Sequence, residues 1–464
     1  MRDTMADMEQ VFYPKSVSII GASNREGSFG RLFLEGFMRM GFHEIYPVHP
    51  REKELLGLKA YPGIKEIPAE VDMAILMIPQ GEALRVVQEC RDKGVKCIVL
   101  FAAGFREKGE EGKKAEEEIA RVIRNSNSRM IGPNTNGLYS PAARLLALPG
   151  SLTAGGLPAE TGSLSVFAQS GSFNDYLCQV LIGKNIRFNK VVSCGNEADL
   201  SSGDFLEYYG QDAGTKIIAG YLEGIKDGRR FYELAKKISR QKPIIIWKGG
   251  LTETGARAAL AHTGSLAGTR QIWEAMFKQA GISSVSSFEE LTDCLLAFSW
   301  LPLPAGKRVA LISGMGGAGV GTSDNCVAMG LEMARYSAET KERLSKLLPP
   351  VGTSISNPLD IGVASLMNPE HYGETAKILA EDENVDMIIG ITAPDNPRSI
   401  KSLAEAVPQI KKPVVATLFE IAGLVEPEMK SLLEHHVPAY TDPKRAAFAL
   451  ARLAEYAEYR SRSD

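Results

Sequence analysis

One pattern occurs three times along the chain and limits its fold more than any other feature. In each copy, a short run typical of a buried strand is followed by small residues and then by a helical pattern. A parallel α/β sheet begins in this way, and the helix N-terminus after the strand can bind an anion. The strand runs start at residues 16, 162 and 308, so the sequence predicts three α/β domains.

We expect these domains to cover residues 1–145, 155–300 and 306–464, because 464 residues are too many for one hydrophobic core. Residues 301–305 contain two prolines and are typical of a linker. Strands and helices alternate in the first domain as in a Rossmann-like sheet. Its expected strands are residues 16–20, 44–49, 72–78, 96–102 and 129–131, with helices at 82–93 and 109–125.

The other two domains show the same alternation. In the second domain, we expect strands at residues 164–167, 190–193, 217–222 and 244–248. In the third, we expect strands at residues 309–312, 387–391 and 414–417, and an amphipathic closing helix at 444–462. The predicted fold class is therefore α/β throughout.

The first glycine-rich loop does not fit a nicotinamide dinucleotide. The loop after residue 20 reads G-x-S, where the dinucleotide fingerprint has G-x-G. The second strand runs into His49, Pro50 and Arg51, where ribose recognition requires Asp or Glu. With Arg51 and Lys53 nearby, a ligand that carries an extra phosphate fits better, and a dehydrogenase is disfavoured.

His262 is the main candidate for a catalytic residue. It lies among small residues, between the alanine-rich run 256–261 and the glycine-rich run 263–268. This composition predicts a mobile loop that exposes a nucleophilic ring nitrogen and lets phosphate approach the backbone. The alternative is that His262 is a solvated bystander, as most loop histidines are.

The strand ends of the second domain place further polar residues near His262. Residues 169–172 follow one strand, Glu223 ends another, and His262 follows a third, so the three groups are expected on one rim of the sheet. Glu223 could accept the proton of one ring nitrogen and leave the other nucleophilic. Alternatively, Glu223 is a solvated turn carboxylate.

Composition excludes several classes of partner. A net charge of −3, with 23% charged residues, provides no basic field for nucleic acid or anionic lipid. No apolar run is long enough to cross a membrane, and the N-terminus does not resemble a signal peptide. The six cysteines form no C-x-x-C pair, so we expect reduced core thiols in a cytoplasmic protein and no metal site. His435 and His436 are interpreted as surface residues.

Several stretches, spread in order over nearly the whole chain, resemble the α subunit of the NDP-forming acyl-CoA synthetases. This group includes ADP-forming acetyl-CoA synthetase and, more distantly, succinyl-CoA synthetase α. The resemblance implies a CoA-binding domain followed by two ligase-CoA domains that are similar to flavodoxin. The stretches are residues 21–30, 55–62, 102–105, 131–137, 169–171, 221–224, 262–268 and 357–360.

The resemblance also implies a role for individual residues. His262 would become phosphohistidine and Glu223 would orient it, and Ser170-Gly171-Ser172 would be the helix N-terminus that holds the phosphoryl group. Thr135 stands where acetate-type synthetases usually have Cys, and Ala318 departs from their Gly-Gly-Pro-Gly, so the acyl group stays open. The implied phosphate-binding residues are Gln169, Ser170, Gly171, Ser172, Gly316 and Gly317, and the implied CoA-binding residues are Gly21, Ser23, Asn24, Arg25, Glu26, Arg51, Pro79, Phe101, Ala102, Ala103 and Asn134.

The implied reaction interconverts acyl-CoA, ADP and phosphate with an organic acid, ATP and CoA, through an acyl phosphate and a phosphohistidine. The sequence contains no Walker-type motif and no ATP-grasp module after Asp464. A separate ATP-grasp β subunit would therefore hold Mg-ADP or Mg-ATP, most simply in an α2β2 complex. The alternative is a catalytically inactive regulatory protein that binds CoA or acyl-CoA.

Overall fold

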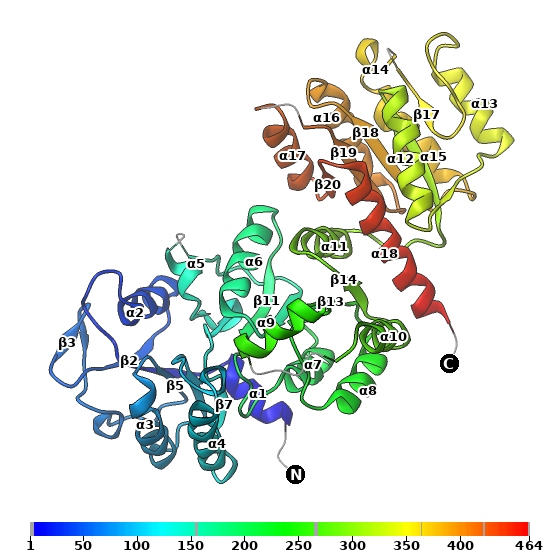
Figure 1. Ribbon diagram of the computed structural model, residues 1–464. Helices are drawn as coiled ribbons and strands as arrows, with labels where there is room; N and C mark the ends of the chain where they lie inside the picture. Colours follow the sequence, from blue (N-terminus) through cyan, green and yellow to red (C-terminus); the bar gives the residue numbers. More distant parts are fainter. Residues whose placement is uncertain (1–3, 154–155, 264–267, 363, 421–422, 463–464) are drawn as a thin grey trace. The chain divides into compact units, whose positions relative to one another are not determined.

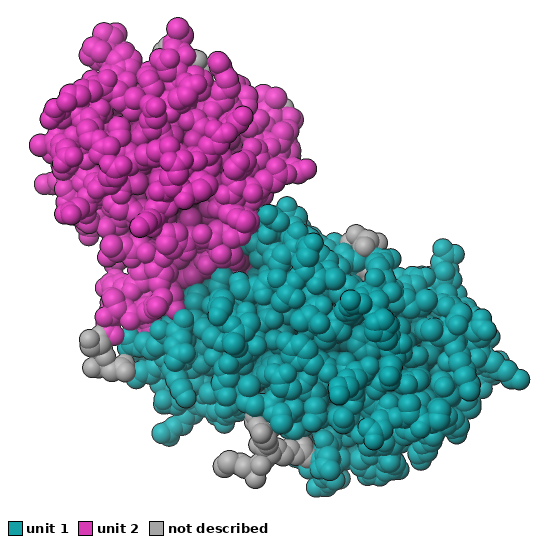
Figure 2. All heavy atoms as spheres, turned by 180° about the vertical axis from the view of Figure 1, so that it is seen from behind, with its two compact units in different colours: residues 1–286 teal, residues 287–464 magenta. Residues whose placement is uncertain are grey.

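The computed structural model describes residues 4–153, 156–263, 268–362, 364–420 and 423–462 (Figure 1). The chain divides into two compact units, residues 1–286 and 287–464 (Figure 2). Unit 1 contains two main sheets and unit 2 contains one. The residue ranges of the three expected domains stay a prediction.

The first sheet of unit 1 is parallel and has the strand order β2-β1-β5-β6-β7. Its inner strands are buried along their whole length, as expected when helices cover both faces. The strands are β1 (Ser16–Ile20), β2 (Glu44–Val48), β5 (Met73–Leu76), β6 (Cys97–Leu100) and β7 (Arg129–Ile131), and the main helices are α2 (Phe29–Met40), α3 (Gln80–Lys93) and α4 (Glu110–Arg124).

The second sheet has the order β14-β13-β12-β10-β11-β8-β9. Its first five strands in this order are parallel, and β8 and β9 form an antiparallel hairpin on the edge of β11. The sequence did not predict this hairpin, which precedes the expected second domain. The strands are β8 (Leu138–Ser140), β9 (Leu145–Leu146), β10 (Leu164–Ala168), β11 (Phe188–Ser193), β12 (Ile217–Leu222), β13 (Ile244–Lys248) and β14 (Ser283–Val285), and the helices are α5 (Pro149–Thr153), α6 (Gly171–Gly183), α7 (Ser202–Gln211), α8 (Gly228–Ile238), α9 (Glu253–Thr263) and α10 (Arg270–Ala280).

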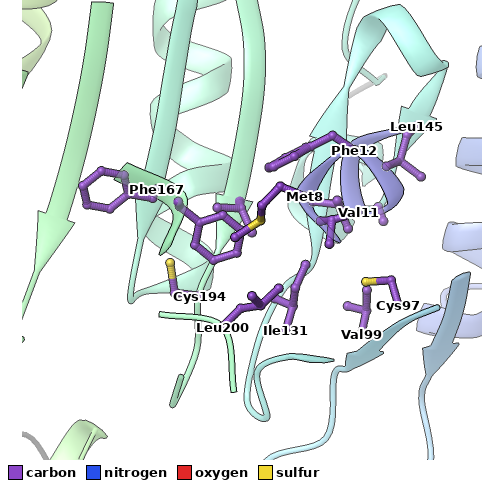
Figure 3. Close-up of a cluster of buried hydrophobic side chains, with 14 of the residues drawn as sticks. Met8, Val11, Phe12, Cys97, Val99, Ile131, Leu145, Phe167, Cys194 and Leu200 are labelled. Carbon is purple, nitrogen blue, oxygen red and sulfur yellow. The ribbon is translucent and has the colours of Figure 1, made fainter. Parts of the chain in front are cut away.

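A single hydrophobic cluster joins the two sheets of unit 1. It contains Val99 and Ile131 from the first sheet, Phe167 from the second, and Phe12 from helix α1 (Thr4–Phe12) (Figure 3). Arg129 at the start of β7 adds ion pairs to Asp7 of α1 and to Asp199 of the loop after β11, at 2.8 and 2.9 Å. Burial of this shared apolar surface explains why the two sheets form one compact unit.

Unit 2 contains a parallel sheet with the order β16-β15-β18-β19-β20, and the short strand β17 also pairs with β15. The expected strands and closing helix of this part are confirmed. The side chain of Asn357 accepts a hydrogen bond from the amide of Leu311 and donates one to the carbonyl oxygen of Val309, so it pairs with the backbone of β15 as a neighbouring strand would. The strands are β15 (Arg308–Ser313), β16 (Glu332–Met333), β17 (Leu359–Asp360), β18 (Met387–Thr392), β19 (Val414–Leu418) and β20 (Ala439–Tyr440), and the helices are α11 (Phe288–Trp300), α12 (Gly316–Ala328), α13 (Ala338–Leu347), α14 (Ala364–Met367), α15 (His371–Glu381), α16 (Pro397–Ala406), α17 (Val425–Glu434) and α18 (Pro443–Ser461).

The parallel part of the first two sheets follows the order second, first, third, fourth, fifth strand, which is typical of flavodoxin-like doubly wound folds. The third sheet follows this order too, apart from the short β17. Ligands of such folds bind beyond the carboxyl ends of the strands, where the order reverses. In unit 1 these places lie between β1 and β5 and between β10 and β12.

Candidate functional site

The glycines after β1 allow the chain to pass close to neighbouring backbone. Gly21 has a φ of 92°, and a Cβ there would lie 2.3 Å from the carbonyl oxygen of Met77. A Cβ on Gly30 would in turn lie 2.3 Å from the carbonyl oxygen of Gly21. Glycine is therefore required at both positions for the loop and helix α2 to pack on the sheet.

The predicted CoA-binding residues gather at one edge of the first sheet. They follow the carboxyl ends of its five strands, with residues 21–26 after β1 and Phe101 after β6. Within the loop, Ser23 accepts a hydrogen bond from the amide of Arg25, and Asn24 accepts one from the amide of Leu56. Because Ser28 caps α2 several residues later, residues 23–26 form a loop and not a helix N-terminus.

The first turn of α6 has the geometry of a helix start that can bind an anion. The helix begins at Gly171, directly after Ser170, whose side chain makes no capping hydrogen bond. The first amides of a helix have no acceptor within the helix, and this end carries partial positive charge. A Cβ on Gly171 would lie 2.4 Å from Cγ of Asn136, so only glycine permits this close approach.

Gln169 connects the start of α6 to Glu223. Its Oε1 accepts hydrogen bonds from the amides of Glu223 and Gly224, at 2.6 and 3.1 Å. Its Nε2 donates to Oε1 of Glu197 and to the carbonyl of Gly224, at 2.9 and 2.8 Å. The amide of Gln169 thus holds the loop after β12, and its direct contact with phosphate stays a prediction.

Two buried ionisable groups flank Glu223. Burial raises the pKa of Glu197, which is only 2% exposed. Lys248 donates to the carbonyl oxygen of Glu223 at 2.8 Å and lies 4.7 Å from the ring centre of Trp273. Burial lowers the pKa of Lys248 to about 8, although Glu223 acts in the opposite direction. Glu223 itself is 5% exposed, so it is not a solvated turn carboxylate.

The prediction of a loop at His262 is wrong for its backbone. Helix α9 continues to Thr263, so His262 lies in the last turn of a helix. Alanine-rich sequence favours helix, and this preference outweighs the glycines that follow. The side chain of His262 and residues 264–267 lie outside the described part of the chain. Helix α9 packs against the 3-10 turn Arg106–Lys108 of the first sheet's edge.

A pocket of about 440 Å³ connects the two predicted binding regions. Phe29 and Phe101 line it on the side of the CoA loops, with ring centres 5.0 Å apart. Ser172 from the first turn of α6 lines the other side, beside Asn136 and Asp175. Burial raises the pKa of Asp175, which accepts a hydrogen bond from Asn136 at 2.9 Å.

The second predicted phosphate loop, in unit 2, already has a carboxylate beside it. Helix α12 begins at Gly316, and a Cβ there would lie 2.8 Å from Oδ2 of Asp360. A carboxylate beside the start of a helix competes with an anionic ligand for the same partial positive charge. Phosphate binding at Gly316 and Gly317 stays a prediction.

The histidine pair near the C-terminus and the six cysteines have ordinary structural surroundings. His435 bonds the carbonyl of Ser431, and His436 lies beside the ring of Trp300. All six cysteines are buried and free. Within the described ranges, no three or more His, Cys, Asp or Glu side chains group as metal ligands, and no helix is long and apolar enough to cross a membrane.

Sequence reasoning missed Glu197, Lys248 and Asp175. Glu197 has a φ of 56° in a loop, and Lys248 ends an otherwise apolar strand. The charge at the end of an apolar strand was the one usable signal for Lys248. For Glu197 and Asp175 the partners are 28 and 39 residues away, so no local pattern marks them.

Comparisons with known proteins match this arrangement along the whole chain. Three family models match consecutive parts: a CoA binding domain over residues 15–141, a succinyl-CoA ligase like flavodoxin domain over 161–298, and a ligase-CoA domain over 309–462. The α subunit of acetate–CoA ligase [ADP-forming] II from Pyrococcus furiosus is 39% identical over 460 residues, which cover 97% of this chain and 98% of the relative. The chain belongs to the α-subunit family of ADP-forming acyl-CoA synthetases.

Other members of the synthetase family support this assignment. Acetate–CoA ligase [ADP-forming] I of Archaeoglobus fulgidus is 36% identical over 452 residues, which cover 97% of this chain and 64% of that relative. The solved acetyl-coenzyme A synthetase 1 of Ca. Korarchaeum cryptofilum, in complex with phosphate and ADP, matches with a TM-score of 0.89 and 33% identity over 98% of both chains. The resemblance and fold class inferred from the sequence are confirmed, and synthetase function is favoured over the inactive regulatory alternative.

Proposed function

We propose that this α subunit binds acyl-CoA and phosphate in unit 1 and passes the phosphoryl group to a nucleotide on a β subunit. One observation carries the proposal. The start of α6 and the buried carboxylate of Glu223 follow β10 and β12, the neighbouring strands between which the order of the second sheet reverses. This is where a doubly wound sheet binds its ligand. Ser172 in the first turn of α6 also lines the pocket that contains Phe101.

The proposed reaction has three steps. Phosphate, held by the amides of Gly171 and Ser172, attacks the thioester carbonyl; the C–S bond breaks, CoA leaves as a thiolate and an acyl phosphate remains. A ring nitrogen of His262 then attacks phosphorus, and the organic acid leaves as a carboxylate. Glu223 offsets the positive charge that develops on the ring. The phosphohistidine finally transfers its phosphoryl group to the terminal oxygen of ADP.

The CoA end of the reaction belongs to the first sheet. We assign the predicted residues around Gly21, Arg51 and Phe101 to CoA, and the pocket between Phe101 and Ser172 to the thioester end. Ser23 and Asn24 act by holding the loop, since both side chains bond its backbone. The aromatic wall formed by Phe29 and Phe101 would shield the thioester from water.

The nucleotide end belongs to a partner. Two relatives are α subunits, which supports a β subunit, and we propose that it is an ATP-grasp protein that binds Mg-ADP and forms an α2β2 complex. The complex of the Ca. Korarchaeum cryptofilum synthetase with phosphate and ADP supports the use of these two substrates. Six buried, free thiols fit a reducing cytoplasm.

Phosphorylation of His262 tests the proposal directly. The chain is mixed with its β subunit and ATP labelled in the γ-phosphate, and protein-bound label is measured after acid and base treatment. We expect acid-labile, base-stable label that His262→Ala abolishes and that His435→Ala, at an exposed position, retains. Absence of label in the wild-type complex, with CoA still bound, would favour the regulatory alternative.

A further inference from the structure

The hydroxyl of Tyr221 lies beside the carboxylate of Glu223. Tyr221 lies near the end of β12 and Glu223 directly follows the strand, so the two side chains are two positions apart and leave the same side of the chain. The hydroxyl donates a hydrogen bond to Oε1 of Glu223 at 3.2 Å. Gln169 and Lys248 hold the backbone of Glu223, at its amide and its carbonyl, whereas Tyr221 acts on the carboxylate itself.

Aromatic packing fixes the position of this hydroxyl. The ring of Tyr221 stacks on Phe173 at 4.7 Å between centres, and Trp247 of β13 lies edge-on at 5.3 Å. A Cβ on Gly249 would lie 2.8 Å from the hydroxyl oxygen, so the glycine leaves room for it. Since Phe173 follows Ser172 in the first turn of α6, Tyr221 connects Glu223 to the proposed phosphate site.

We propose that Tyr221 is a positioning residue for phosphorylation of His262: its hydroxyl holds the carboxylate of Glu223 in the orientation that the histidine requires. This inference rests on the function proposed above. A hydrogen bond from a hydroxyl whose ring is fixed by packing limits the rotation of the carboxylate, and a catalytic group that is displaced by a fraction of an ångström loses much of its effect. Burial raises the pKa of Tyr221, so the hydroxyl stays protonated and remains a donor at neutral pH.

The variant Tyr221→Phe removes the hydroxyl and keeps the ring stacked on Phe173. In the complex with the β subunit, we expect single-turnover phosphorylation of His262 to slow about tenfold, which is the effect of losing one hydrogen bond to a charged group. The KM for CoA should not change, because the CoA loops lie on the other sheet. Tyr232→Phe is the matched control and should leave the rate unchanged, because Tyr232 is a half-buried tyrosine of α8 whose hydroxyl donates a hydrogen bond to Gln279.

A double-variant cycle separates positioning from general packing. If Tyr221 acts through the carboxylate, Tyr221→Phe should cause no further loss in a Glu223→Ala background, which lacks the acceptor of the Tyr221 hydroxyl. An equal tenfold loss in that background, or no loss in the wild-type background, would overturn the inference. If the wild-type complex carries no label on His262, the proposed function fails, and the positioning role fails with it.

Discussion

Replacing Gln169 by glutamate should destabilise unit 1 strongly and in a pH-dependent way. The side chain is 6% exposed, and its Nε2 lies 2.9 Å from Oε1 of Glu197 and 2.8 Å from the carbonyl oxygen of Gly224. Gln169→Glu keeps the shape but puts an oxygen where the donor stood. Two buried carboxyl groups at this separation cannot both be charged at neutral pH, so the folded variant must take up a proton.

The cost of that proton sets the magnitude. Holding a glutamate protonated at pH 7 costs about 1.4 kcal/mol for each pH unit above its ordinary pKa of about 4.3, or about 3.7 kcal/mol. The added proton lets one hydrogen bond form again between the two carboxyl groups or to Gly224. The other of the two acceptors that Gln169 Nε2 served, Glu197 Oε1 or the carbonyl oxygen of Gly224, is left without a donor, which costs about 1 kcal/mol more. We therefore expect Gln169→Glu to lower the free energy of unfolding by about 4–5 kcal/mol at pH 7.

The sign of the pH dependence follows from proton binding. The folded variant binds one proton more than the unfolded chain between pH 4.3 and 7, so its deficit relative to wild type should shrink as the pH falls. Urea unfolding followed by tryptophan fluorescence at pH 7 and 5.5 should show the deficit reduced by about 2 kcal/mol. The control is Gln211→Glu, at the exposed end of α7. A deficit below about 1.5 kcal/mol at pH 7, or one independent of pH, would refute the reasoning.

Three further expectations concern other parts of the chain. Gly171→Ala should slow phosphorylation of His262 at least tenfold, because the added Cβ would lie 2.4 Å from Asn136. Gly183→Ala, at the end of the same helix, should not slow it, because nothing lies within 4 Å of the added Cβ. Equal rates for the two variants would contradict the argument that Gly171 permits a close approach. Asp386→Asn should lower the stability of unit 2 by about 1–2 kcal/mol at pH 7. Burial acts to raise the pKa of Asp386, but hydrogen bonds from Arg308 lower the pKa overall. The stability that the Asp386 carboxylate contributes should therefore be fully present above the ordinary Asp pKa and be lost as the pH falls through the lowered pKa, which urea unfolding at several pH values would measure. The purified α chain should make no ATP from acyl-CoA, ADP and phosphate until a β subunit is added, and ATP formation by the chain alone in a luciferase assay would contradict the proposed division of substrates.

Local apolar patterns were sufficient to predict most of the parallel strands. The expected strands at residues 129–131, 217–222 and 244–248 agree with β7, β12 and β13, because each is a mostly buried run with a polar or glycine-rich turn after it. The hairpin of β8 and β9 was missed, since strands of three and two residues show no periodicity. Its pairing with β11 depends on residues about fifty positions away, which no local pattern reveals.

The sequence predicted those parts of the candidate site whose position depends only on the order of the strands. Gln169 and Glu223 follow adjacent parallel strands, so the rule for strand ends placed them together. The sequence could not show that the amide of Gln169 is fully occupied by protein groups, nor that Asp360 reaches the start of α12. Both depend on side chains that meet only after the sheets are packed. At His262, two local signals conflicted, and the helix-forming alanines outweighed the glycines.

The hairpin at residues 138–146 has a practical consequence for anyone who wishes to study the CoA-binding part in isolation. A fragment cut after residue 145 would carry nearly all of the hairpin away from its place beside β11. The fragment would then expose the apolar residues of β8 and of the start of β9 without their partner strand. The remaining protein would expose the hydrogen-bonding edge of β11, whose residues are buried in the intact chain. Unpaired edges of this kind recruit strands from other molecules, so both pieces should precipitate. A cut before Leu138 leaves the hairpin with β11 but still divides the cluster formed by Phe12, Ile131 and Phe167, and the first two sheets are therefore best expressed together.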